Sequence, residues 1–509
     1  MSLRNTVRVL ASIALVALVP LACGGDDSPT DVPDPDPNEP PEPATVTLSE
    51  STLNFTALGD SVRLAAEVLD QHGTEMSEPD ITWTSSDTTV AVVRGGGWVV
   101  AHGNGATQVV ATAGQASDTA VVDVAQVAAS WALSSDSLTL GEGEEDRLTA
   151  TAVDANGVPM EELAVSWTSA DEAVATVDAE GLVTAVRAGG ETVITATAGD
   201  RADTAVITVL DQIVIQRFTQ VYLINEDGSG ERVLPTGDGN RRPVWSPDGD
   251  RVVFTSTRDG DSEIYVINPD GTGETNLTNH PGSDVDPHVS MDGRIVFEST
   301  RDGDGEIYVM DADGGGQSNL TNSPASDGQP AWSPDGTRIA FWSDRGTGID
   351  LYVMNADGSD PTALTDTGGI NWRHAWSPDG SRIAFESSRD GNSEIYVMNA
   401  DGSDQTRLTN DPAADHDPVW SPDGSRIAFL SERTGDREVF VMNADGSAQV
   451  NLTDDPGSDT VLGWSADGTR ILFQSDRDGS YSLYSVPADG GESRFITNDV
   501  SAAGWRPGA

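Results

Sequence analysis

The sequence predicts an all-β protein in which two β-sandwiches are followed by a seven-bladed β-propeller, with six blades as the alternative. Three observations carry this prediction. A five-residue motif recurs every 43 or 44 residues in the C-terminal part, a longer segment repeats after 84 residues in the middle, and short Val-, Ile- and Thr-rich runs alternate with Gly-containing turns throughout. A chain of 509 residues is also too long for a single hydrophobic core.

The N-terminal segment resembles a bacterial lipoprotein signal. Arg4 and Arg8 precede an apolar run at 9–18, which is too short to span a bilayer, and Cys23 is the single cysteine of the chain. We therefore expect a signal peptide at 1–22 and a lipid-modified Cys23, with an ordinary free cysteine as the alternative. The Pro- and Asp/Glu-rich residues 23–43 then form an acidic, extended tether.

Two segments of the middle region align with each other. Residues 81–87 (ITWTSSD) match 165–171 (VSWTSAD), and both continue into a strand that ends in Ala-Thr-Ala-Gly. Strands at this spacing predict sandwiches with Trp83 and Trp167 in their cores. The segments resemble bacterial immunoglobulin-like domains of group 2, over 44–125 and 126–210, and the resemblance implies a spacer role.

The C-terminal region consists of blade-sized repeats. A typical repeat carries a Trp-Ser-Pro-Asp-Gly turn, a strand, an Arg-Asp-Gly turn, a Tyr-containing strand, an Asp-Gly turn and a short fourth strand. The motif stands at 245–249, 332–336, 376–380 and 420–424, with altered copies at 289–293 and 464–468. Four strands in a repeat of this length are typical of a propeller blade.

The strand count predicts seven blades. Third strands begin near Val221, Ile264, Ile307, Leu351, Ile395, Val439 and Leu483. Residues 213–234 supply three strands without a first one, and residues 504–507 supply a first strand at the chain's end. Joined, they complete a closing blade that removes two open sheet edges.

The repeats at 211–509 resemble those of TolB and of the propeller domains of prolyl-oligopeptidase-like proteins. The TolB resemblance implies a six-bladed propeller, so a count of seven departs from it. The peptidase-like relatives imply an appended catalytic domain, but the sequence contains no G-x-S-x-G or H-E-x-x-H motif to supply one.

The charge of the chain limits its partners. Its 83 acidic and 28 basic residues give a formal net charge of −55, which repels nucleic acids and anionic membrane surfaces. Contact with a membrane is therefore expected through the lipid anchor alone, and we expect a monomer. Asp311-Ala312-Asp313-Gly314 leaves calcium open as a ligand, although hairpin-turn chemistry explains this segment better and no other cofactor is expected.

The loops that depart from the repeat are the candidate binding face. Turns between second and third strands share one face with the blade-to-blade loops, because successive turns of a meander alternate sides. The unrepeated polar and aromatic residues at that face are Arg241, Arg242, His280, Asp286, His288, Trp372, Arg373, His374, Asp415, His416 and Asp417.

These features predict a non-catalytic, lipid-anchored protein of the bacterial cell envelope, with the outer membrane favoured. Its propeller would bind an envelope or extracellular protein or a polysaccharide, held away from the membrane by the sandwiches. The alternative is a propeller enzyme, such as a metal-dependent polysaccharide lyase with its metal on the channel histidines. We assign no catalytic or metal-binding residue, because the histidines do not occupy equivalent repeat positions.

Overall fold

The computed structural model describes residues 39–507 with the exception of 162, and these residues form strands and turns without a helix. The all-β fold class is therefore confirmed. The expected signal peptide, Cys23 and most of the expected tether lie outside the described residues. Within the described part of the chain, no helix is long and apolar enough to span a membrane.

Contacts divide the chain into two compact units. The first comprises the described residues up to Ser130 together with Ala152–Met160, and the second comprises Trp131–Thr151 and the described residues from Glu161 onward.

The first unit contains a β-sandwich with the sheets β2-β9-β8-β5 and β3-β7-β6 and the smaller pair β1-β4. Its strands are β1 (Pro43–Leu48), β2 (Thr52–Phe55), β3 (Ser61–Arg63), β4 (Ala66–Asp70), β5 (Thr82–Ser85), β6 (Ala91–Arg94), β7 (Trp98–Ala101), β8 (Gly105–Ala113) and β9 (Ala116–Val124). Trp83 packs against the core from its edge. Gly97 has a φ of 81°, and a Cβ there would lie 2.9 Å from the Trp83 ring, so this turn requires glycine.

The second unit begins with the same strand order, β11-β18-β17-β14 and β12-β16-β15. The strands of this region are β10 (Ser130–Leu133), β11 (Ser137–Leu140), β12 (Glu145–Arg147), β13 (Ala150–Val153), β14 (Ser166–Ser169), β15 (Ala175–Val177), β16 (Leu182–Ala185), β17 (Gly190–Ala198) and β18 (Arg201–Val209). Trp167 again packs against the core, and Gly181 takes the place of Gly97 beside it.

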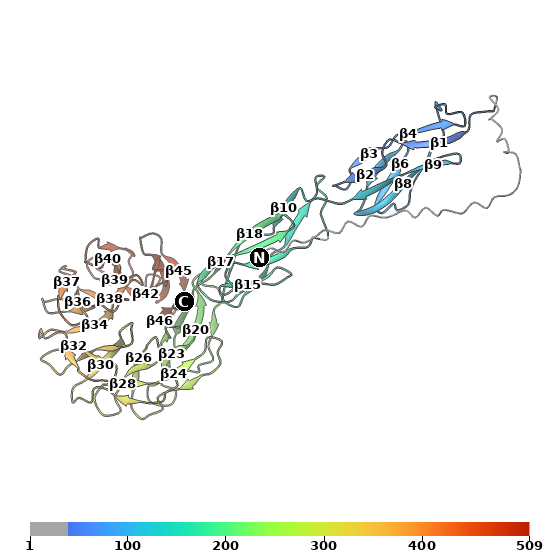
Figure 1. Ribbon diagram of the computed structural model, residues 1–509. Helices are drawn as coiled ribbons and strands as arrows, with labels where there is room; N and C mark the ends of the chain where they lie inside the picture. The colour runs from blue at the N-terminus through green and yellow to red at the C-terminus, as the bar shows by residue number, and fades with distance from the viewer. Residues whose placement is uncertain (1–38, 162, 508–509) are drawn as a thin grey trace, which may run out of the picture. The chain divides into compact units, whose positions relative to one another are not determined.

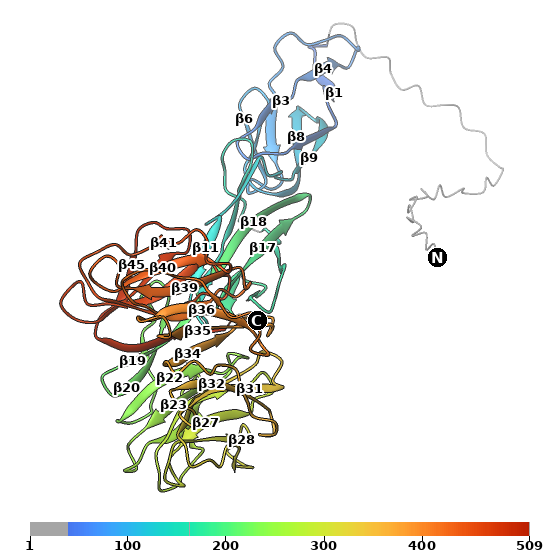
Figure 2. The same cartoon turned by 90° about the vertical axis from the view of Figure 1, so that its left-hand side faces the viewer.

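The rest of the second unit consists of seven four-stranded sheets. Figure 1 shows them arranged as a ring, and Figure 2 shows the same sheets from the side. In chain order, six of them contain the strands β22 (Asn240–Trp245), β23 (Val252–Ser256), β24 (Glu263–Ile267), β25 (Thr275–Asn276); β26 (Asp284–Val289), β27 (Ile295–Ser299), β28 (Glu306–Met310), β29 (Ser318–Asn319); β30 (Asp327–Trp332), β31 (Arg338–Ser343), β32 (Asp350–Asn355), β33 (Thr362–Ala363); β34 (Asn371–Trp376), β35 (Arg382–Ser387), β36 (Glu394–Asn399), β37 (Thr406–Arg407); β38 (Asp415–Trp420), β39 (Arg426–Ser431), β40 (Glu438–Asn443), β41 (Val450–Asn451); and β42 (Asp459–Trp464), β43 (Arg470–Ser475), β44 (Ser482–Pro487), β45 (Arg494–Thr497).

The seventh sheet joins the two ends of this region in the order β21-β20-β19-β46. It contains β19 (Gln212–Arg217), β20 (Gln220–Asn225), β21 (Arg232–Val233) and β46 (Val500–Trp505). Ile213 lies opposite Trp505 in an antiparallel pairing, as the complementary strands of the sequence predict. This pairing leaves neither terminal piece with an open inner edge.

Aromatic side chains fill the space between neighbouring sheets. Six phenylalanines on the second strands are fully buried, and each ring lies 5.5–5.7 Å from an aromatic ring on the third strand. The six are Phe254, Phe297, Phe341, Phe385, Phe429 and Phe473. Because these positions recur in every complete repeat, the repeat itself specifies the core.

The Asp-Gly segments are hairpin turns. In the segment that raised the calcium alternative, the Asp311 N–H donates to the Gly315 carbonyl and Asp313 Oδ1 accepts the Gly315 N–H. Gly314 adopts a φ of 84°. These contacts are those of a tight turn, so the turn explains both aspartates.

Candidate functional site

The first strand of each complete sheet lies innermost, next to the first strands of its neighbours. In all six complete sheets the pairing of this strand with the second strand shifts at a bulge. In the first five of them the bulged residue is not glycine and has a positive φ. The bulged residue has a φ between 47° and 51° in all five. We call these residues the bulge ring: Arg242, Asp286, Gln329, Arg373 and Asp417.

Proline explains why the strands are bulged at this point. In four of the five sheets the residue after the bulge is a buried proline, namely Pro243, Pro287, Pro330 and Pro418. Proline has no N–H to donate to the second strand, and within a strand it is confined largely to edges and bulges. In the remaining sheet His374 takes the place of the proline.

The bulge ring lines a cavity of about 500 Å³, which we call the channel cavity. Its wall comes from the innermost strands β22, β26, β30, β34, β38 and β42. All five bulge residues contribute to it, together with His288, His374 and the apolar side chains of the same strands. Non-glycine residues with positive φ are costly and concentrate at turns and functional sites. Asp360, Asp404 and Ala448 repeat such a φ in the turn before the fourth strand, whereas the five residues of the bulge ring line the cavity.

Arginine and aspartate alternate around the ring. Arg242 forms an ion pair with Asp286 of the next sheet, and Arg373 forms the same pair with Asp417. Gln329 lies between the two pairs in chain order. Because each arginine has five N–H donors and each pair is open to solvent, the cavity offers donors and acceptors to a ligand.

A buried glutamate lies next to the ion pair of Arg373 and Asp417. Glu386 on β35 is 1% exposed, accepts a hydrogen bond from His416 Nδ1 at 3.0 Å and one from Ser393 at 2.6 Å, and lies 3.9 Å from Arg373 Nε. Burial alone would raise the pKa of Glu386, but these hydrogen bonds outweigh it and lower the pKa. The same bond, opposed by burial, raises the pKa of His416.

The two histidines in the cavity wall are neutral. Although solvent in the channel reaches His288, the surrounding protein desolvates the ring and lowers its pKa to about 4, and burial has the same effect on His374. His288 Nδ1 accepts the backbone N–H of Trp332 at 3.3 Å. Neither ring nitrogen of His374 makes a hydrogen bond of good geometry, although the backbone of Ala340 lies close enough to oppose the effect of burial on its pKa. A buried imidazole without partners is unusual and distinguishes this sheet from the others.

The structure gathers six of the eleven predicted residues in the channel cavity: Arg242, Asp286, His288, Arg373, His374 and Asp417. The other five, Arg241, His280, Trp372, Asp415 and His416, do not line it. The backbone N–H of His280 donates to Glu263, and Asp415 forms a buried ion pair with Arg433.

Trp372 and His416 both lie next to Glu386, outside the cavity lining. Trp372 lies opposite Glu386 in the strand pairing and has the Arg373 guanidinium 5.3 Å from its ring centre. Sequence reasoning missed Gln329 and Glu386. Gln329 could have been found as the repeat equivalent of Arg242, whereas nothing in the repeat distinguishes Glu386.

Two family models match the chain, one in the propeller region and one in the preceding sandwich. The sequence model of the TolB beta propeller domain matches residues 214–323, 294–374, 365–448 and 413–504, together more than half of the chain. The model of the bacterial Ig-like domain (group 2) matches residues 127–209.

Ice-binding protein 1 of Shewanella frigidimarina is 33% identical over 133 residues, which are 26% of this chain. The chain thus spans about 15% of the length of this curated relative.

Solved structures resemble part of the chain. A putative TolB from Agrobacterium tumefaciens is 26% identical, with a TM-score of 0.39, over 47% of this chain and 90% of that chain. An oligogalacturonate lyase from Vibrio parahaemolyticus is 14% identical, with a TM-score of 0.46, over 68% of this chain and 98% of that chain.

Proposed function

Because the chain belongs to the TolB beta propeller domain family, we propose that it is a non-catalytic protein of the bacterial cell envelope. Its propeller binds a protein or polysaccharide partner at the channel cavity. The observation that carries the proposal is the bulge ring, in which five sheets place a strained residue into one wall. Backbone strain costs stability, so strain that recurs at one site indicates that the site has a function.

The chemistry of the cavity favours a ligand with neutral or mixed polarity. Arginine donors and aspartate acceptors alternate there, and proline, valine and alanine side chains separate them. The chain's net charge of −55 opposes a strongly acidic ligand. A sugar chain or a loop of a protein presents hydroxyls, amides and apolar patches in the arrangement that such a wall complements.

The remaining parts of the chain act as an anchor and spacers in this proposal. A lipid on Cys23 would hold the protein to a membrane, with the outer membrane favoured, and the acidic segment and the sandwiches would carry the propeller away from it. Cells labelled with a fatty-acid probe test the anchor. We expect label on the wild-type protein and none on Cys23→Ala, and label on that variant contradicts the anchor.

Capture of partners in intact cells tests the binding site. We expect chemical crosslinking of the wild-type protein to capture a discrete partner and Arg242→Ala/Arg373→Ala to lose it. Arg241→Ala is the matched control, because Arg241 is an exposed neighbour on the same strand that does not line the cavity. Identical capture by the double variant and the control places the binding site elsewhere.

A metal-dependent lyase is the second candidate, and His374 favours it. Its two unpartnered ring nitrogens and the neutral His288 share the cavity wall, and neutral imidazole is a common metal ligand. Against it, the lone pair of His288 Nδ1 is already engaged by Trp332. Stoichiometric transition metal in the purified protein, abolished by His374→Ala and His288→Ala, would favour the lyase over the binding protein.

A further inference from the structure

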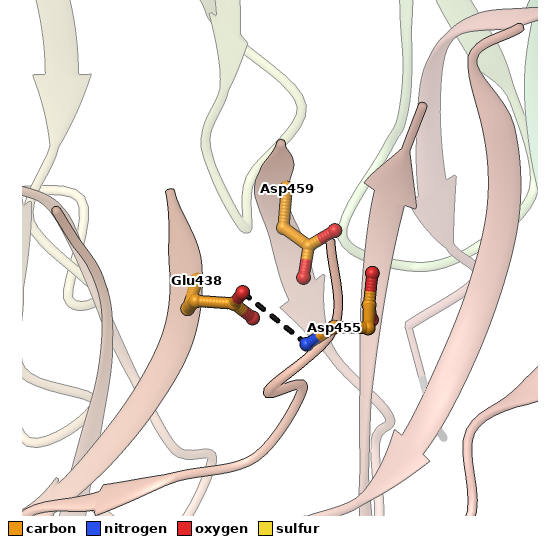
Figure 3. A group of neighbouring side chains, drawn as sticks. All are labelled: Glu438, Asp455 and Asp459. Atoms are coloured by element: carbon orange, nitrogen blue, oxygen red, sulfur yellow. Dashed lines mark hydrogen bonds between the residues drawn. The ribbon is translucent and has the colours of Figure 1, made fainter. Parts of the chain in front are cut away.

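A group of carboxylates lies outside the channel, where two neighbouring sheets meet. Glu438 begins β40, Asp459 begins β42 of the next sheet, and Asp455 lies in the segment that connects the sheets. One oxygen from each lies within 4.8 Å of the others. Figure 3 shows the three side chains, which we call the carboxylate junction, converging from the strands and the connecting segment.

Asp459 is the unusual member of the junction. Its side chain is fully buried. The hydroxyls of Ser475 and Thr453 lie close enough to lower its pKa, but no hydrogen bond of good geometry reaches either carboxylate oxygen. Glu438, also buried, accepts hydrogen bonds from the Thr453 hydroxyl and from the backbone N–H of Asp455. An ionised carboxylate without partners is strongly unfavourable inside a protein, so Asp459 requires a compensating positive group.

Other junctions of the propeller supply that positive group from an arginine. Arg301 Nη2 lies 2.9 Å from Asp284, and Arg345 Nη2 lies 2.7 Å from Asp327. At the carboxylate junction the equivalent residue is Arg477. Its Nη2 lies 2.5 Å from Asp455 and 3.5 Å from Asp459, and neither contact has hydrogen-bond geometry.

The preceding junction shows how a third carboxylate is otherwise balanced. It also carries three, Glu394, Asp411 and Asp415, but two arginines neutralise them: Arg433 pairs with Asp415 at 2.9 Å and Arg407 pairs with Glu394 at 2.5 Å.

At the carboxylate junction the position of Arg407 is taken by Asn451, whose side-chain N–H group has no partner. Three carboxylates there face one arginine, which leaves an excess of two negative charges.

We propose that Glu438, Asp455 and Asp459 bind a divalent cation that prefers oxygen ligands, of the Ca²⁺ class, at this junction. A divalent charge balances the excess of two negative charges that three carboxylates and one arginine leave. The spacing of the oxygens fits a Ca²⁺ ion, whose ligands lie about 2.3–2.6 Å from the metal and therefore up to about 5 Å apart. A site made only of carboxylates favours such hard cations over metals that select sulfur or nitrogen.

Calcium titration of the full-length protein, after treatment with a chelator, tests the proposal. The titration is run at about pH 8 in about 0.5 M NaCl, where the surface carboxylates are screened. We expect saturable 1:1 binding that raises the thermal midpoint of unfolding. Absence of binding for Ca²⁺, Mg²⁺ and Mn²⁺ overturns the proposal.

Two variants locate the site. Asp459→Asn introduces the residue that two other sheets carry at this position, Asn240 and Asn371, so the fold accommodates it. Asn451→Arg supplies the arginine of the preceding junction. We expect each to lower the Ca²⁺ affinity at least about tenfold, because Asp459→Asn removes a negative charge from the site and Asn451→Arg adds a positive charge beside it.

Asp415→Asn, in the junction that has two arginines, is the matched control and should keep the wild-type affinity. Binding that survives in both Asp459→Asn and Asn451→Arg, or that is lost equally in Asp415→Asn, overturns the assignment. If Asp459→Asn fails to fold, Asn451→Arg still decides, because it alters a partly exposed side chain and leaves all three carboxylates in place.

Discussion

Arg345 and Arg373 are both arginines paired with an aspartate of the propeller, but their surroundings differ. Arg345 donates two hydrogen bonds to Asp327, whose side chain is fully buried between sheets. Arg373 pairs with Asp417 in the channel wall, where their side chains are 41% and 24% exposed. The first kind of pair recurs at equivalent positions of other sheets, whereas the second depends on the residue that each sheet places at its bulge. The repeated pairs therefore stabilise the propeller, and the unrepeated ones remain available for recognition.

The largest expected effect is on the buried pair. Arg345→Ala leaves Asp327 charged and without its partner inside the protein, and we expect a loss of about 3–5 kcal/mol in the free energy of unfolding. Arg373→Ala should cost less than about 1 kcal/mol, because its pair is exposed to water. Urea denaturation of both variants measures the difference, and equal losses would contradict the distinction between the two kinds of pair.

The carboxylate junction should respond to pH. The pKa of Glu438 is raised to about 7 and that of Asp459 to about 6, from 4.5 and 3.8. The folded state therefore binds more protons than the unfolded state over this range, and stability decreases as the pH rises through it.

We expect the free energy of unfolding to fall as the pH is raised from about 5 to about 8 in the presence of a chelator. This fall should be about 1–3 kcal/mol smaller for Asp459→Asn than for the wild type. Denaturation curves at the two pH values measure this difference. Parallel losses in the two proteins would show that the junction does not titrate in this range.

A smaller effect is expected where one sheet departs from the others in the channel wall. His374→Pro restores the residue that four other sheets carry at this position, removes two unpartnered ring nitrogens and restricts the unfolded chain. We expect a gain of about 1 kcal/mol in stability. Thermal unfolding measures the gain. If His374→Pro loses partner capture while its stability rises, His374 contributes to binding. A loss of stability would contradict the structural equivalence of position 374 with the proline positions of the other sheets.

Features that repeat could be predicted from the sequence, and features that depend on one copy could not. The recurrence of Phe385 and its equivalents specifies strands, turns and core together, and the complementary ends of the region predict the pairing of β19 with β46. Four of the five residues of the bulge ring were predicted from the sequence, because they depart from the repeat.

The positive φ of Gln329 and the burial of Glu386 were not foreseen. Both arise from strand pairing across the sheet, which no local pattern encodes. The carboxylate junction was missed for the same reason. Its three acids lie on different strands and segments, and what distinguishes it from the preceding junction is that its third carboxylate has no second arginine.

A photoreactive amino acid placed in the channel wall tests the binding claim most directly. Position 329 lies in the bulge ring, whereas position 291 is a 71% exposed methionine in the turn between the first and second strands, at the opposite end of the same type of strand. Illumination of intact cells should give a discrete adduct from position 329 and none from position 291. Adducts from position 291 alone, or the same adducts from both positions, would contradict binding at the channel cavity.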